Sequence, residues 1–207
     1  MDYFFSPLAC SMAGRLLILE AELPIAMHPV SLQRKQTADG EDFHAVSAQG
    51  QVPVLRFDDG RVLTENIAVL HVLADLAPSH GYLPPRRTAA GLAALQWLAF
   101  SATEVHKLCL YPMFNRQTPD AVKDWARAQL PRRLAVAARQ LDDTPWLAGD
   151  AFTVADAHFG WALTLCRLAR VDGAKEVSLA RYWDRLQSRP AFAACLNEER
   201  ALYEQHA

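Results

Sequence analysis

The sequence predicts two domains of different class, an α/β domain of residues 1–78 followed by an all-helical domain of residues 88–207. Two observations carry this prediction. Strand and helix patterns alternate up to residue 78, whereas only helical spacing follows residue 85. Residues 78–85, PSHGYLPP, are rich in helix breakers, so residues 79–87 are expected to form a linker. Alternating elements followed by a run of helices are typical of two separate domains.

The expected elements of the first half are short and end at turn residues. Strands are predicted at residues 3–5, 26–30, 52–57 and 61–63, and helices at residues 11–22 and 64–76. The last two strands flank Asp58-Asp59-Gly60, which predicts a β-hairpin. In the second half, helices are predicted at residues 91–110, ending before Pro112, and at residues 121–141, 154–170, 178–188 and after Pro190.

The composition is that of an ordinary globular protein. Hydrophobic residues make up 51% and charged residues 21% of the 207 residues, which suffices for a sizeable core. The formal net charge of -2 argues against a dedicated nucleic-acid binder, which should carry a basic excess. No secretory leader and no apolar stretch of membrane length is visible, so we expect a cytoplasmic protein without a membrane partner.

Four widely spaced cysteines, Cys10, Cys109, Cys166 and Cys195, form neither a Cys-x-x-Cys pair nor a zinc pattern, so no metal site is expected. The last three lie in helical patterns and are interpreted as small buried hydrophobes. Cys10 follows an aromatic strand and a Ser-Pro turn, where a helix should begin. Free N–H groups and the helix dipole favour the thiolate there. Cys10 is therefore either a site for thiol chemistry or a residue buried there by chance.

Two further positions offer groups that a peptide ligand could use. Pro53 lies inside a strand pattern, where a cis Val52–Pro53 bond would leave the Val52 backbone as an open edge for strand addition. The alternative is a trans proline on an edge strand, since cis is the minority state. At the start of the next helix, Glu65 and Asn66 suit a zwitterion, because the helix end attracts a carboxylate and Glu65 an ammonium. The alternative there is simple N-capping by Thr64.

Two motifs of the helical half have a structural interpretation. Thr153 and Asp156 have the spacing of a capping box and are assigned to folding, not catalysis. His106 continues an apolar stripe on its helix, which is usual for a structural histidine, although a pKa near 6.5 also suits proton transfer.

Taken together, these motifs resemble those of the cytosolic glutathione transferases, most closely the bacterial beta class, over essentially the whole chain. The matching segments are YFFSPLACS at 3–11, GQVPVL at 50–55, LTEN at 63–66, TEVHK at 103–107, FTVADA at 152–157, RYWDR at 181–185 and RP at 189–190. The resemblance implies a thioredoxin-like domain followed by a helical bundle domain, a homodimer, and glutathione as co-substrate with no other cofactor.

The resemblance also implies roles for individual residues. Cys10 and His106 would be catalytic, and the cysteinyl backbone of glutathione would pair with Val52. Lys35 would reach its glycyl carboxylate, and Glu65 and Asn66 its γ-glutamyl end. The implied glutathione-binding set is Ser11, Lys35, Gln51, Val52, Pro53, Glu65, Asn66, Thr103, Glu104 and Lys107. Glu104 is offset from the stripe and could act across a dimer interface. A hydrophobic electrophile would meet Tyr111, Phe114, Trp161 and Leu165.

The chain lacks a local dithiol, and it departs from the family pattern at Ala48, Gln49 and Ala99. Ala13 stands where a dithiol site has its resolving cysteine, so glutathione would have to supply the second thiol. Ala48 and Gln49 replace a proline and a lysine before the QVP segment, and Ala99 stands where many relatives have asparagine. Three hypotheses follow: a glutathione transferase, a glutathione-dependent thiol-disulfide exchanger acting through Cys10, and a non-catalytic binding module with the same fold.

Overall fold

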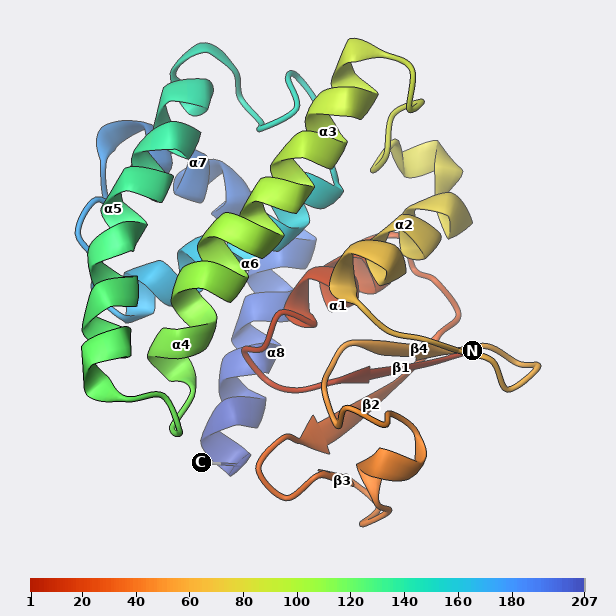
Figure 1. The fold of residues 1–207 in the computed structure, drawn as a ribbon. Helices are drawn as coiled ribbons and strands as arrows, with labels where there is room; N and C mark the ends of the chain where they lie inside the picture. Colours follow the sequence, from red (N-terminus) through yellow and green to blue (C-terminus); the bar gives the residue numbers. More distant parts are fainter. Residues whose placement is uncertain (207) are drawn as a thin grey trace. The chain divides into compact units, whose positions relative to one another are not determined.

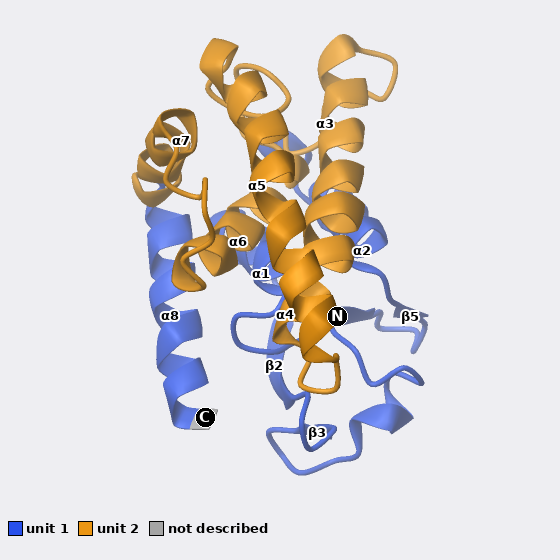
Figure 2. Ribbon diagram, turned by 60° about the vertical axis from the view of Figure 1, so that its left-hand side comes forward, with its two compact units in different colours: residues 1–80, 189–207 blue, residues 81–188 orange. Residues whose placement is uncertain are grey.

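The computed structural model describes residues 1–206, which form two compact units (Figure 2). The first unit contains Met1–His80 together with the segment from Arg189 onwards, and the second contains Gly81–Ser188. The boundary near residue 80 agrees with the expected linker. The C-terminal segment differs from the expectation, because it belongs to the first unit although we placed it in the helical domain.

The first unit is built on a five-stranded sheet of order β3-β2-β1-β4-β5 (Figure 1). Its strands are β1 Asp2–Phe5, β2 Ala26–Ser31, β3 Gln36–Thr37, β4 Val54–Arg56 and β5 Val62–Leu63. The β1–β2 pair is parallel and the other pairs are antiparallel, so the sheet is mixed. The predicted hairpin is confirmed as β4–β5, with Gly60 at φ +84° in its turn. We missed β3, because its two residues lie in a polar stretch without alternation.

Three helices complete this unit: α1 Met12–Glu20, α2 Asn66–Leu76 and α8 Pro190–His206, with the short 3₁₀ turns η1 Phe43–Ala45 and η2 Pro78–His80. Helix α1 packs against both α2 and α8. The core beside the site contains Phe4, Val30, Phe43, Val52 and Val54. Buried residues of β1, β2 and β4 thus pack with Phe43 and Val52 in one cluster, which holds the chain where β4 begins.

The second unit is helical, as predicted. Its helices are α3 Ala89–Phe100, η3 Ser101–Leu110, α4 Tyr111–Phe114, α5 Asp120–Asp143, α6 Val154–Leu168 and α7 Val177–Gln187. The expected end before Pro112 is wrong, because α3, η3 and α4 follow one another without a break. Pro112 therefore lies within a continuous helical stretch, where it cannot donate a backbone hydrogen bond to the preceding turn. The intervening η3 is a π-helix, a form often found at functional sites.

In the part of the chain that the structure describes, no helix combines the length and the apolar character needed to cross a membrane.

Candidate functional site

Cys10 lies in the turn between β1 and α1, two residues before the first helical residue. Its side chain is partly exposed, and its Sγ lies 3.6 Å from the carbonyl oxygen of Val52. The thiol is not in a disulfide. Cys10 is thus an accessible thiol beside the Val52–Pro53 segment, whereas Cys109, Cys166 and Cys195 are buried as expected. Burial raises the pKa of the Cys166 and Cys195 thiols to about 12, which keeps both protonated.

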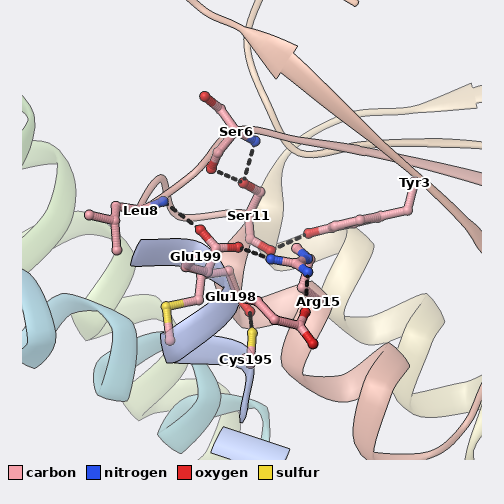
Figure 3. A network of polar contacts seen from close by, with 9 residues as sticks. Tyr3, Ser6, Leu8, Ser11, Arg15, Cys195, Glu198 and Glu199 are labelled. Carbon is pink, nitrogen blue, oxygen red and sulfur yellow. Dashed lines mark hydrogen bonds and ion pairs between the residues drawn. The ribbon is translucent and has the colours of Figure 1, made fainter. Parts of the chain in front are cut away.

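Ser11 and Tyr3 hold this turn in place through hydrogen bonds (Figure 3). The Ser11 hydroxyl accepts a hydrogen bond from the Ser6 N–H at 3.1 Å and donates to the Ser6 carbonyl at 3.3 Å. The Tyr3 hydroxyl donates to the Ser11 carbonyl at 2.7 Å. Because Ser11 is fully buried, its hydroxyl shapes the Cys10 turn and is not presented at the surface.

A buried ion pair supports the same turn from the C-terminal helix. The Glu199 carboxylate on α8 receives a hydrogen bond from the Leu8 N–H and contacts Arg15 Nη1 at 2.7 Å. Arg15 Nη2 contacts Glu198 at 2.8 Å, and its guanidinium lies over the Phe5 ring. Figure 3 shows Leu8, Arg15, Glu198 and Glu199 near the turn. Sequence reasoning missed Glu199, because its partners are 184 and 191 residues away and no local pattern links them.

The Val52–Pro53 peptide bond is cis, so the alternative of a trans proline on an edge strand is wrong. Val52 precedes β4, outside the ladder that joins β4 to β1. Among the described residues, no hydrogen bond satisfies the Val52 N–H, while its carbonyl faces Cys10. The segment is therefore an open backbone edge of the kind that can pair with a peptide.

Helix α2 begins at Asn66 without a side-chain cap, so the alternative of Thr64 as N-cap is wrong. Glu65 takes the N-cap position with φ +67°, a backbone conformation that is uncommon outside glycine. Its side chain is exposed, whereas Asn66 is buried and donates from Nδ2 to the Cys10 carbonyl at 2.7 Å. The uncapped helix end and the Cys10 turn are thus joined directly.

Lys35 and Gln51 lie on the other side of Val52. Lys35 Nζ donates to the Gly50 carbonyl at 2.8 Å, two residues before Val52, and Gln51 is exposed. The first unit therefore brings together seven of the predicted residues: Cys10, Ser11, Lys35, Gln51, Val52, Pro53 and Asn66.

His106 on η3 is half-buried against aromatic rings of the second unit. Its ring centroid lies 4.7 Å from that of Trp161 in an edge-to-face arrangement and 5.8 Å from that of His158. Burial, with a smaller effect of Lys107, lowers the pKa of His106 to about 4. The imidazole is thus neutral at pH 7. The neutral ring can donate one hydrogen bond and accept another, but its proton affinity is low for a general base at that pH.

His158 was not among the predicted site residues. It is fully buried on α6, and its Nδ1 lies 2.7 Å from the Ser101 hydroxyl. Burial, together with His106, lowers the pKa of His158 to about 3. Its position on an apolar face gave no signal in the sequence beyond that of a satisfied core histidine.

The other predicted residues of η3 have partners within the second unit. Thr103 is exposed and donates to the Ala99 carbonyl at 3.0 Å. Glu104 lies 3.5 Å from Arg133 on α5, and Lys107 lies over the Tyr111 ring at 4.9 Å.

The four residues that were predicted to contact a hydrophobic electrophile differ in their exposure. Tyr111 and Phe114 are about half exposed, at 44% and 51%, and Leu165 is half-buried. Trp161 is only 2% exposed and packs on the two histidines. Trp161 is therefore part of the helical core.

Thr153 and Asp156 form the predicted capping box at the start of α6. Asp156 is fully buried and accepts from the Leu147 and Thr153 N–H groups, the Thr153 hydroxyl and the Tyr182 hydroxyl. These contacts have a structural role, as the sequence predicted.

Comparison with known proteins agrees with this architecture. Residues 9–76 match the sequence profile of the glutathione S-transferase N-terminal domain, and residues 101–190 that of the C-terminal domain. Glutathione S-transferase GstA of Escherichia coli O157:H7 is 33% identical over 96% of this chain and 98% of its own length.

Two solved structures are similar over the whole chain. A sphingomonad glutathione S-transferase complexed with glutathione has a TM-score of 0.89 and 34% identity, and covers 96% of this chain and 98% of that one. The beta class enzyme of Sphingomonas chungbukensis has a TM-score of 0.89 and 31% identity, with the same coverage.

A thioredoxin-like unit with an open edge at a cis proline, together with a helical unit, defines the glutathione S-transferase fold. With the similarity to GstA over nearly its full length, the chain belongs to the glutathione S-transferase family and is similar to its bacterial beta class.

Proposed function

We propose that this protein conjugates the thiolate of glutathione to hydrophobic electrophiles, with Cys10 in contact with the glutathione sulfur. The observation that carries the proposal is the geometry of the first unit. Cys10 Sγ lies 3.6 Å from the carbonyl of an unpaired backbone edge at Val52, and the first residue of α2 is hydrogen-bonded to the Cys10 carbonyl.

Each part of glutathione has a complementary group in this unit. The cysteinyl N–H and carbonyl pair with the Val52 backbone beside the cis Pro53 bond and Gln51. The γ-glutamyl carboxylate meets the free N–H groups at the start of α2, and its ammonium meets Glu65. The glycyl carboxylate meets Lys35. The sulfur in the middle then lies next to Cys10.

The chemical step is a nucleophilic substitution or addition at the electrophile. The glutathione thiol loses its proton to solvent, and its sulfur lone pair forms the new C–S bond while the leaving group, where there is one, departs with its electron pair. Cys10 lies directly before the N-terminal end of α1, and the dipole of that helix favours negative charge on a sulfur placed there.

Other residues enter the proposal through the resemblance of residues 103–107 to the family motif. On that basis His106 hydrogen-bonds the thiolate as a neutral imidazole, and Thr103, Glu104 and Lys107 contribute to glutathione binding. The electrophile binds near Tyr111, Phe114 and Leu165. We also propose a homodimer, which light scattering of the purified protein tests directly.

Binding to immobilised glutathione and thermal stabilisation by free glutathione test the proposal first. We expect both, together with a conjugation rate on an aryl halide above the uncatalysed reaction. A properly folded protein that shows neither binding nor stabilisation is a non-catalytic module with this fold. His106→Ala should lower the conjugation rate, and an unchanged rate would exclude its role.

The accessible Cys10 thiol favours a second activity, glutathione-dependent disulfide exchange. The Cys10 thiolate would attack the glutathione sulfur of a disulfide that contains glutathione, forming a Cys10–glutathione mixed disulfide and releasing the other sulfur as a thiolate. A second glutathione thiolate would then attack that bond, releasing oxidised glutathione and regenerating Cys10, since Ala13 offers no resolving thiol.

Cys10→Ala separates the two activities. If conjugation is retained and reduction of a mixed disulfide is lost, Cys10 serves exchange alone and conjugation uses other groups. If both rates fall, Cys10 supports the glutathione thiolate in both reactions.

A further inference from the structure

His44 and Lys35 converge on Gly50 at the edge of the candidate glutathione site. Gly50 has φ +57°, and a Cβ built on it would lie 2.7 Å from His44 Cε1 and 3.1 Å from Lys35 Cδ. Lys35 itself has φ +54° and donates from Nζ to the Gly50 carbonyl. The backbone thus brings a cationic side chain and an imidazole, nine residues apart in sequence, to the same α-carbon.

The His44 ring is available for a ligand. Its backbone N–H donates to the Asp42 carboxylate at 2.9 Å, and this hydrogen bond caps the start of η1. Within the part of the chain that the structure describes, neither ring nitrogen of His44 has a hydrogen-bond partner, and the side chain is exposed. An imidazole can donate to a carboxylate in its neutral form, and does so more strongly when protonated.

The order of groups along the site indicates what this pair would bind. Glutathione is linear with its cysteine in the middle, so pairing at Val52 and a γ-glutamyl group at Asn66 send the glycyl end in the opposite direction. Gly50 lies on that side, two residues before Val52. Gln49 also stands where the family pattern has a lysine, so this chain has one cation fewer in the segment before Val52.

We propose that His44 is a second contact for the glycyl carboxylate of glutathione and, with Lys35, sets the preference of the site for a free carboxylate at that end. This inference rests on the proposed function, because it takes glutathione as the ligand. It assigns a residue outside the motifs that the sequence analysis identified.

Isothermal titration calorimetry with two ligands tests the proposal. Glutathione has the glycyl carboxylate, and glutathione monoethyl ester has it blocked. We expect His44→Ala to weaken glutathione binding roughly 5–10-fold, as for one charge-assisted hydrogen bond, and to change ester binding by less than about 2-fold. Lys35→Ala should show the same selectivity with a larger loss.

His80→Ala is the matched control. His80 is another exposed histidine of the first unit, at the far end of α2 from Asn66. Eleven helical residues place it on the order of 15 Å from the site, so neither ligand should bind differently.

Two results would overturn the inference alone: wild-type affinity of His44→Ala for glutathione, or an equal loss for both ligands. Wild-type protein that does not bind glutathione would overturn the proposed function as well.

Discussion

Each compact unit contains a fully buried carboxylate, and the two are satisfied in different ways. Glu199 in the first unit is paired with the buried Arg15 guanidinium and the Leu8 N–H. Asp156 in the second unit is surrounded by neutral donors, mostly within nine residues of it. One carboxylate therefore links distant segments, whereas the other completes a local cap.

The difference explains how the C-terminal segment comes to belong to the first unit. Helix α8 packs against α1, and Glu199 on this helix accepts a hydrogen bond from the N–H of Leu8, two residues before Cys10. In contrast, Asp156 holds only elements of its own unit: the segment before α6, the first turn of α6 and Tyr182 on α7. A buried charge can thus support a reactive turn in one place and a helix start in another.

The largest expected effect is that of Glu199→Ala. The substitution leaves the Arg15 guanidinium buried without its main partner and the Leu8 N–H unpaired, so we expect a loss of about 3–5 kcal/mol in the free energy of unfolding. Urea denaturation measures it. Glu198→Ala, at a carboxylate whose side chain is 52% exposed although it also contacts Arg15, is the control and should cost less than about 1 kcal/mol. Equal losses for the two variants would contradict this account.

Asp156→Ala should have the next largest effect. It removes the acceptor of four hydrogen bonds, although no cation is left unpaired, and we expect a loss of about 2–4 kcal/mol by urea denaturation. Asp150→Ala is a suitable control, because Asp150 is exposed in the loop before the capping box. A loss larger than that of Glu199→Ala would reverse the order that the two environments predict.

Most of the fold and the local part of the site could be predicted from the sequence. The capping box is a short pattern with one structural consequence that neighbouring residues determine, whereas the Val52–Pro53 pattern left a cis and a trans form open. Glu199, His158 and the π-helical η3 could not be predicted, because their roles arise from partners far along the chain or from the packing of a continuous helix. His44 is an intermediate case. Its own position carries no motif, and only the missing Cβ of Gly50 shows how the His44 and Lys35 side chains can approach the same residue.

The stability of the protein should depend on pH in opposite ways through Asp156 and through the two histidines of the second unit, His106 and His158. Burial raises the pKa of Asp156 to about 6, although its hydrogen bonds act to lower it. The folded protein therefore takes up this proton before the unfolded chain does. The stability that it contributes is fully present below about pH 4 and is lost as the pH rises through 6. His106 and His158 act in the opposite direction, because their pKa values of about 4 and 3 lie below 6.5 and their contribution is lost as the pH falls.

Asp156→Asn should consequently make the protein more acid-sensitive. The wild-type free energy of unfolding should decline between pH 7 and pH 4, because two histidines oppose one carboxylate. In the variant, the total decline in the free energy of unfolding over this pH range should be larger by about 2 kcal/mol, since the carboxylate no longer offsets the two histidines. Chemical denaturation at a series of pH values gives both slopes. Parallel slopes would show that Asp156 is ionised throughout this range.

The smallest expected effect separates the two halves of the capping box. Thr153→Ala removes the hydroxyl that donates to Asp156 at 3.0 Å and leaves both backbone donors in place. We therefore expect a loss of about 1 kcal/mol, within the range of single N-cap substitutions. Thr153→Ser, which keeps the hydroxyl, should lose less than half of that. If Thr153→Ala costs as much as Asp156→Ala, the buried carboxylate depends on the hydroxyl for its position, and the cap acts as one unit instead of as four separate hydrogen bonds.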